Sequence, residues 1–171
     1  MQNYFELFDL ETSFFIDESA LKRSYQLEVS RFHPDNFATK SEPEKLQALQ
    51  NTSLLNSAYS VLKAPLSRAT YLLKLEGMNA FDEKDTAMEE SFLISQIELR
   101  DELETIEEKK DSLGLDDFIE RVDSFIEEKI ESISEAYNLS SDQQLIKRHV
   151  RELKFFDQLY KEANALMDEW F

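Results

Sequence analysis

The decisive stretch of the sequence is residues 17–37, which read DESALKRSYQLEVSRFHPDNF. It begins with an Asp-Glu pair, and carboxylates stabilise the positive end of a helix dipole. Apolar side chains then recur at helical spacing on one face, at Leu21, Tyr25 and Phe32, although Glu28 interrupts the stripe. A proline at position 34 disfavours α geometry in the residue before it. We therefore predict a helix over 17–32 and a loop immediately after it.

A second helix is predicted to follow this loop. Ser41 and Glu44 have the spacing of a capping box, in which each side chain satisfies a free backbone donor of the first turn. The helical pattern runs to about residue 62, and the proline at position 65 ends it. We expect the two helices to lie antiparallel. The predicted apolar side of the second helix consists of Leu46, Leu49, Leu55, Ala58, Tyr59 and Leu62.

Helical patterns continue through the rest of the chain. A short helix at about 66–75 is expected next, with Gly77 closing it in a left-handed cap. Gly114 and residues 138–141 should supply turns between three longer helices, which most simply form an antiparallel bundle. These helices are predicted at about 89–111, 115–137 and 142–170. Their apolar stripes are Phe92, Leu99, Leu103 and Ile106; Phe118, Val122, Phe125, Ile126 and Ile133; and Ile146, Leu153, Phe156, Tyr160, Ala163, Met167 and Trp170.

Composition supports an all-α fold with two domains. Only two glycines and three prolines interrupt 171 residues, and a hydrophobic content of 42% is enough to build cores. We predict a first domain at 1–77, a linker at 78–88 and a three-helix bundle at 89–171. The chain has no cysteine, which excludes disulfides and cysteine-ligated clusters on this chain alone. With no apolar run of 18 residues and no N-terminal signal segment, we expect a cytoplasmic protein that does not use a membrane.

Charge is spread unevenly along the chain. The formal net charge is -17; residues 1–77 hold 10 acidic and 8 basic residues, whereas residues 78–171 hold 26 and 11. Binding to a nucleic-acid backbone relies on clustered lysine and arginine, so nucleic acid is disfavoured as a partner. A basic protein surface is the expected partner of the second domain.

The tripeptide His33-Pro34-Asp35 is expected at the tip of the helical hairpin. Pro34 fixes one backbone angle, so the tripeptide should form a stiff and exposed recognition element. Taken alone, a His-Pro-Asp sequence could equally be a solvated turn. The residues around it are therefore needed to choose between these interpretations.

The passage from residue 4 to residue 77 resembles the J-domain family. The matching segments are Tyr4-Phe5-Glu6-Leu7-Phe8 as a first short helix, the helix at 17–32, His33-Pro34-Asp35 in the loop, and Asn56-Ser57-Ala58-Tyr59-Ser60-Val61-Leu62. In that family the tripeptide docks on a DnaK-class chaperone and stimulates its ATP hydrolysis. The resemblance implies this role for His33, Pro34 and Asp35. It also implies a positive face on the preceding helix, supplied by Lys22, Arg23 and Arg31.

Two further segments narrow the resemblance to the HscB family, the dedicated co-chaperones of iron-sulfur cluster biogenesis. They are PLSRATYLL at 65–73 and FLISQIELR at 92–100, and the resemblance covers nearly the whole chain. It implies a protein that is not itself an enzyme and needs no cofactor or metal. Such a protein binds the scaffold protein IscU, delivers it to an HscA-type chaperone and activates the ATPase of that chaperone.

The loop region departs from general-purpose J-domains. Asn36 stands where many of them place a basic residue, and Gln26 and Glu28 make the preceding helix less basic. These differences should weaken docking on a general DnaK chaperone. We therefore expect a specialised HscA-type partner.

Helical geometry predicts an exposed apolar patch on the helix at 89–111. At about 100° per residue, three apolar residues point away from the core stripe, beside three acids. They are Leu93, Ile94 and Ile97, with Glu98, Asp101 and Glu104. Such a patch marks a protein-binding site, although packing on the first domain or a shifted helix phase would also account for it. In the HscB family the corresponding face binds IscU, which implies scaffold binding here, with Phe155 as the matching contact on the last helix.

Two other functions compete with this interpretation. An enzyme could use His33 as a base oriented by Asp35, but an exposed tip has no pocket to position a substrate. A purely structural acidic bundle would account for residues 78–171 and leave the first domain unexplained. His149 is expected to be a surface or boundary residue rather than a metal ligand. We predict no catalytic residue and no metal site.

Overall fold

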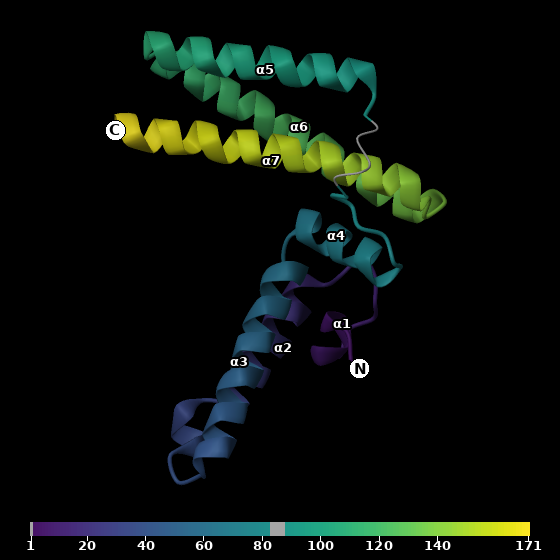
Figure 1. The fold of residues 1–171 in the computed structure, drawn as a ribbon, viewed down its shortest axis with the longest axis vertical. Helices are drawn as coiled ribbons and strands as arrows, with labels where there is room; N and C mark the ends of the chain where they lie inside the picture. The colour runs from purple at the N-terminus through teal and green to yellow at the C-terminus, as the bar shows by residue number, and fades with distance from the viewer. Residues whose placement is uncertain (1, 83–87) are drawn as a thin grey trace. The chain divides into compact units, whose positions relative to one another are not determined.

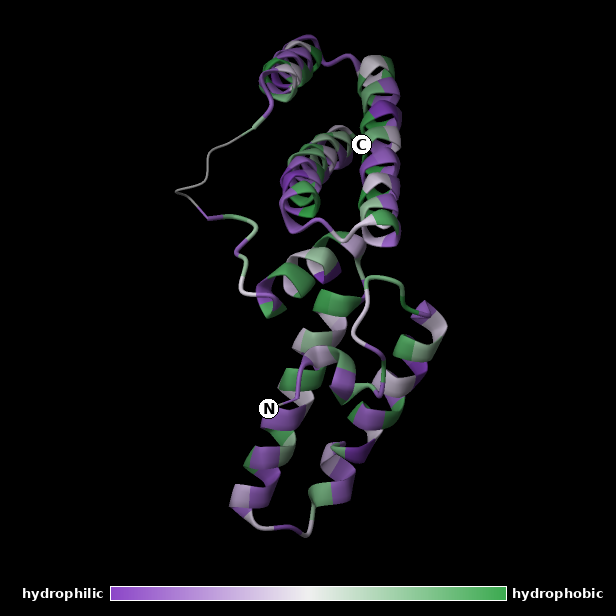
Figure 2. Cartoon of the chain, turned by 90° about the vertical axis from the view of Figure 1, so that its right-hand side faces the viewer, coloured by the Kyte–Doolittle hydropathy of each residue, from purple (hydrophilic) through white to green (hydrophobic). Residues whose placement is uncertain are grey.

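The computed structural model describes residues 2–82 and 88–171, and it divides into two compact units. The first unit ends at Glu76 and the second begins at Gly77. Within the described residues every regular element is a helix, which confirms the all-α fold class (Figure 1). Residues 83–87 of the predicted linker lie outside the described residues. Hydrophobic and hydrophilic residues alternate along the helices, as amphipathic helices require (Figure 2).

The first unit is built on an antiparallel helical hairpin. Its elements are α1 (Tyr4–Leu7), α2 (Glu18–Arg31), the 3-10 helix η1 (Pro34–Phe37), α3 (Glu42–Leu62) and α4 (Pro65–Leu75). Helices α2 and α3 lie side by side, and the η1 segment joins them at one end (Figure 1). The predicted helices and the break at residues 33–34 are therefore confirmed.

Side-chain caps explain where these helices start. The Asp17 carboxylate accepts a hydrogen bond from the backbone N–H of Ala20 at the start of α2. The Ser41 hydroxyl accepts one from Glu44 at the start of α3, which is one half of the capping box predicted there. A complete capping box instead begins α1, where Asn3 and Glu6 each accept from the other's backbone N–H.

Aromatic contacts tie the flanking helices to the hairpin. Tyr25 of α2 and Tyr59 of α3 stack with ring centroids 4.2 Å apart, and this pair joins the two long helices. The Tyr71 hydroxyl of α4 accepts a hydrogen bond of 2.9 Å from the backbone N–H of Tyr4, which holds α1 in place. The buried core beneath these contacts consists mainly of Phe5, Phe8, Leu21, Leu55, Ala58, Leu62, Ala69 and Leu73.

The predicted apolar side of α3 is wrong at its first turns. Leu46 and Leu49 are 55% and 67% exposed, whereas Ala48 is buried. The face of α3 that packs inward follows Ala48, Leu55, Ala58 and Leu62, and a helix turning 100° per residue carries Leu46 and Leu49 out of that column. Two leucines near the loop are therefore left in contact with solvent.

The second unit is a three-helix bundle of α5 (Glu90–Lys109), α6 (Ser112–Leu139) and α7 (Gln143–Trp170). The four predicted stripe residues of α5 are all buried. On α6 and α7 most predicted stripe residues are buried, and the rest are partly buried against the same core; these are Phe125, Ile126, Tyr160, Met167 and Trp170. The predicted stripes are thus confirmed.

Gly114 does not form the turn that we predicted for it. The left-handed residue between α5 and α6 is Lys110, with φ of 49°, and Gly114 lies within the first turn of α6. Its backbone N–H donates to the carboxylate of the N-cap residue Asp111 at 3.0 Å, and a Cβ at position 114 would collide with that carboxylate. By contrast, Gly77 has the expected left-handed conformation, with φ of 84°.

The described start of the predicted linker packs on α7. Ala80 is buried, and Arg151 of α7 donates a hydrogen bond of 3.4 Å to its carbonyl oxygen. The Lys154 ammonium lies 4.3 Å from the centroid of the Phe81 ring. Both contacts lie within the second unit, so this part of the chain is ordered by α7.

Candidate protein-binding surfaces

The His33-Pro34-Asp35 tripeptide forms an exposed and locally ordered tip. The His33 side chain is 59% exposed and that of Asp35 is 91% exposed. Pro34 begins the η1 helix, where its missing N–H costs no hydrogen bond. His33 Nδ1 accepts a hydrogen bond of 3.2 Å from the backbone N–H of Asp35, so the two side chains are held on one short turn.

This geometry bears on the competing enzyme interpretation. Nδ1 of His33 accepts a backbone hydrogen bond, and this contact favours the neutral tautomer that presents Nε2–H as a donor. The Asp35 carboxylate lies 3.5 Å from Nδ1 and would pair with it only if that nitrogen carried a proton. The tip therefore presents a donor and a carboxylate to solvent, which suits recognition better than proton abstraction.

Asn36 orders the loop through two hydrogen bonds that the sequence did not reveal. Its backbone N–H donates to the His33 carbonyl at 2.9 Å, and its side-chain amide donates to the Ser30 carbonyl at 2.8 Å. The Ser30 carbonyl lies in the last turn of α2 and also accepts from the backbone N–H of His33 at 3.4 Å, so the Asn36 amide adds a second link between the loop and the end of this helix. Asn36 thus fixes the tripeptide relative to α2, a task that a long basic side chain would not perform in the same way.

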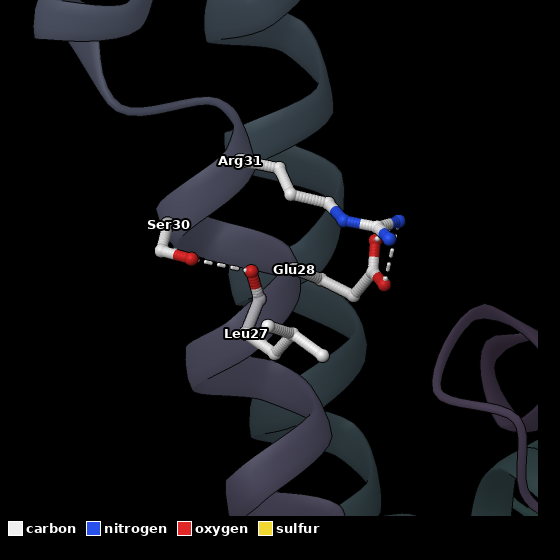
Figure 3. Close-up of polar contacts among 4 residues, drawn as sticks. All are labelled: Leu27, Glu28, Ser30 and Arg31. Carbon is white, nitrogen blue, oxygen red and sulfur yellow. Dashed lines mark hydrogen bonds and ion pairs between the residues drawn. The ribbon is translucent and has the colours of Figure 1, made fainter.

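The three predicted cationic residues of α2 differ in their surroundings. Lys22, Arg23 and Arg31 are all exposed. Arg31, however, forms an ion pair of 3.2 Å with Glu28, one helical turn earlier (Figure 3). Glu28 is the residue that interrupts the apolar stripe, and its side chain is only 26% exposed. Its carboxylate offsets the positive charge nearest the tripeptide.

Helix α5 presents the predicted apolar patch to solvent. Leu93, Ile94 and Ile97 are 43%, 49% and 62% exposed, while the core stripe of the same helix is buried. This pattern excludes the shifted helix phase. The acids Glu98 and Asp101 are exposed beside the patch, as predicted. Unpaired apolar side chains rimmed by carboxylates form a surface suited to a protein partner.

Phe155 of α7 lies at the junction of α7 and α5, partly buried. Its ring packs edge to face against Phe92, with centroids 5.8 Å apart. The guanidinium of Arg100 lies 5.5 Å from the Phe155 ring centroid and also pairs with Glu162. Arg100 follows Ile97 by three residues, so it connects the α5 patch to Phe155. Sequence periodicity gave no signal for this bridging arginine.

A buried ionic group joins α6 to α7 in the body of the bundle. Glu152 is 4% exposed and pairs with Lys129, while His149 Nδ1 lies 3.9 Å from the same carboxylate. Burial by itself would raise the pKa of the Glu152 carboxyl. His149 and Lys129 together lower this pKa by more than burial raises it, so the net pKa lies below its ordinary value. The His149 side chain is 17% exposed, so the residue lies at the boundary between core and surface, one of the two positions predicted for it.

No helix among residues 2–82 and 88–171 is both long and apolar enough to cross a membrane.

The comparison with protein families identifies the second unit. A family model described as the HSCB C-terminal oligomerisation domain matches residues 88–164. Full-length relatives are also similar. The co-chaperone protein HscB homolog of Vibrio vulnificus strain YJ016 is 40% identical over 170 residues, which is 99% of each chain. The homolog of Vibrio parahaemolyticus is 39% identical over 168 residues, which is 98% of each.

Solved structures give the same result. Chaperone HscB from Vibrio cholerae matches with a TM-score of 0.85 and 35% identity, covering 99% of this chain and all of its own. Human co-chaperone HscB matches with a TM-score of 0.87 and 29% identity, over 96% of this chain and 81% of its own. The Jac1 co-chaperone of Saccharomyces cerevisiae, at 24% identity and a TM-score of 0.75, shares the fold.

Proposed function

Because this chain belongs to the HscB family of co-chaperones, we propose that it couples an iron-sulfur scaffold protein to a chaperone ATPase. In this proposal the first unit is a J-domain whose His33-Pro34-Asp35 loop activates an HscA-type, DnaK-class chaperone. The bundle at 89–171 holds the scaffold protein IscU through α5, and residues 78–88 link the two. The chain acts in the cytoplasm and assists the transfer of clusters that its partners carry.

The observation that carries the proposal is the ordered tip of the hairpin. Two adjacent polar side chains are exposed, yet hydrogen bonds from Asp35 and Asn36 fix their backbone. A loop that is already ordered loses little conformational freedom on binding, so its contacts can be used to stabilise one state of a partner. A partner's active conformation would be favoured only if it binds this tip better than the resting conformation does.

The α5 face supports the second half of the proposal. Its three apolar residues are about half exposed, so burying what remains would contribute about 1 kcal/mol each. The surrounding carboxylates, within a domain of strongly negative charge, would steer a basic partner over roughly 8 Å at physiological salt. Affinity therefore rests on the apolar centre, and the acids mainly set the association rate and the orientation.

The proposed preference for a specialised chaperone rests on the helix that precedes the loop. Glu28 holds Arg31 in an ion pair, and Asn36 replaces a basic side chain with an internal hydrogen bond. Both features lower the positive potential around the tripeptide. Stimulation of an HscA-type chaperone should therefore exceed that of a general DnaK chaperone; equal or stronger activation of the general chaperone would contradict this preference.

A coupled ATPase assay tests the proposed function. The steady-state ATPase rate of an HscA-type chaperone would be measured alone, with IscU, with this protein, and with both. We expect the wild-type chain to raise the rate and His33→Gln to abolish that rise, since the substitution keeps the size of the side chain but changes the exposed donor group. His33 is exposed, so circular dichroism should show unchanged folding. A rise of wild-type size with His33→Gln would overturn the assignment of the loop.

A further inference from the structure

The hairpin tip also carries an apolar pocket with a volume of about 440 Å³. It lies between the end of α2, the η1 segment and the first turns of α3. Its apolar lining consists of Phe32, Pro34, Phe37, Ala38, Ala48 and Leu49. The rings of Phe32 and Phe37 stack with centroids 6.3 Å apart and form one wall. The volume falls within the usual range for sites that receive a ligand or a side chain.

The polar residues of the pocket have their polar atoms engaged elsewhere. The Thr52 hydroxyl donates to the Ala48 carbonyl at 3.0 Å, one turn back along α3. The Lys45 ammonium pairs with Glu42 at 3.3 Å. The Thr52 hydroxyl and one donor of the Lys45 ammonium are thus already used, and six of the eight lining residues are apolar, so the pocket suits an apolar group.

Leu49 at the edge of the pocket is 67% exposed, although it is a large apolar residue on a helix with an available inward face. Leaving such a side chain in water gives up the stabilisation that burial would supply. No described segment of the chain covers it. Exposed apolar residues that line a concave surface mark a place where a partner inserts.

Pro34 makes the pocket continuous with the activating tripeptide. It lines the pocket and stands between the two exposed polar residues His33 and Asp35. A protein that touches both of these side chains therefore lies next to the pocket. The occupant should come from the same surface of the partner that contacts the loop.

We propose that this pocket receives a branched or flexible apolar side chain, of the kind found in leucine, isoleucine or methionine, from the chaperone surface that grips the His33-Pro34-Asp35 loop. The inference rests on the proposed function and assigns separate roles to two parts of the tip. The polar tripeptide triggers hydrolysis, whereas the pocket holds the chaperone in place. Loss of the pocket should thus weaken binding without lowering the rate reached at saturation.

Two variants test the pocket from opposite directions. Leu49→Ala removes part of its wall, and Ala38→Leu fills it from an exposed position whose φ of -58° and ψ of -32° suit any residue. Leu54→Ala is the matched control, because Leu54 is an exposed leucine of the same helix that does not line the pocket. All three positions tolerate change, so circular dichroism and thermal unfolding should report intact folding.

The readout is the ATPase rate of the HscA-type chaperone, titrated with each variant of the full chain. We expect Leu49→Ala and Ala38→Leu to raise the half-maximal concentration about 5- to 10-fold with the saturated rate unchanged, and Leu54→Ala to match the wild type. If both pocket variants titrate like the wild type while His33→Gln abolishes stimulation, the pocket inference fails and the proposed function stands. A fall in the saturated rate would also contradict the inference. If His33→Gln stimulates normally, both proposals fail.

Discussion

The hairpin tip and the α5 face are both exposed, but the chain constructs them in different ways. The tip comes from one continuous stretch, and its order rests on hydrogen bonds among residues 30–36. The α5 face has no such local network; it is exposed because the opposite stripe of the same helix is buried in the bundle. A site of the first kind fixes the geometry of polar groups, whereas the second kind offers apolar area.

This difference indicates different tasks. Preorganised polar groups discriminate between conformations of a partner, and exposed apolar area supplies affinity. Changes at the tripeptide should therefore alter a rate, and changes on α5 should alter a dissociation constant. The apolar pocket beside the tripeptide would add an affinity element to the first site.

The largest effect is expected on the α5 face. Leu93→Ala combined with Ile97→Ala removes two half-exposed side chains from the centre of the patch. Affinity for IscU should fall about 30-fold, because roughly 2 kcal/mol of apolar burial is lost, about 1 kcal/mol from each side chain. Isothermal titration calorimetry measures this directly.

The control for that experiment is Leu113→Ala, at a position 79% exposed just after the turn that follows α5. It should bind IscU like the wild type. Stimulation of the chaperone without IscU should also be unchanged in the double variant. Wild-type affinity in the double variant would remove the α5 face from the proposal.

The next effect concerns the buried ion pair between Lys129 of α6 and Glu152 of α7. Glu152→Gln leaves Lys129 partly buried without its anion, which should destabilise the bundle by about 2 kcal/mol at neutral pH. Because the folded-state pKa of Glu152 is lowered, its stabilisation is complete above the unfolded value of about 4.3 and is lost as pH falls through the lower folded-state pKa.

Urea unfolding of wild type and Glu152→Gln between pH 7 and pH 3 would follow this loss. The difference in the free energy of unfolding should stay constant down to about pH 5 and shrink below about pH 4. A difference that grows on acidification would contradict the lowered pKa. Stimulation of the chaperone under native conditions should be unaffected, which sharpens the separation between the two units.

The smallest effect lies next to the tip. Glu28→Gln releases Arg31 from its ion pair without changing the size of the side chain. Arg31 is 65% exposed, and an i,i+3 pair with one exposed member contributes little to stability, so folding should be unchanged. The positive potential beside the tripeptide should rise, and the half-maximal concentration for chaperone stimulation should fall about 2- to 3-fold at low salt. That gain should diminish in 0.5 M salt; a gain independent of salt would rule out the electrostatic explanation.

Periodicity predicted the helices and the exposed face of α5, because the core stripe of a bundle helix repeats regularly for many turns. Periodicity failed at the end of a helix that extends beyond the core. Leu46 and Leu49 are apolar, but the buried face of α3 contains the small residue Ala48 at this height instead. Gly114 was assigned to a turn from its usual role, whereas it lies in the first turn of α6, where its backbone N–H donates to the Asp111 cap.

Features made by pairs distant in sequence were out of reach. Lys129 and Glu152 stand on different helices, and nothing in either local pattern shows that the two charges are buried together. The bridging position of Arg100 over Phe155 also depends on how α5 and α7 pack. The tripeptide could be located because it is a short continuous motif, whereas the pocket beside it depends on the packing of η1 against α3.

The central claim is that one chain must carry both surfaces, and mixing two defective variants tests it most directly. His33→Gln keeps the α5 face, and the Leu93→Ala, Ile97→Ala double variant keeps the tip. The ATPase rate would be measured with the HscA-type chaperone and IscU present. An equimolar mixture of the two variants should reach only the rate that the double variant gives by itself, because neither chain can both bind IscU and activate the chaperone. Recovery of the full wild-type rate by the mixture would show that the two surfaces can act from separate chains, and it would contradict the account.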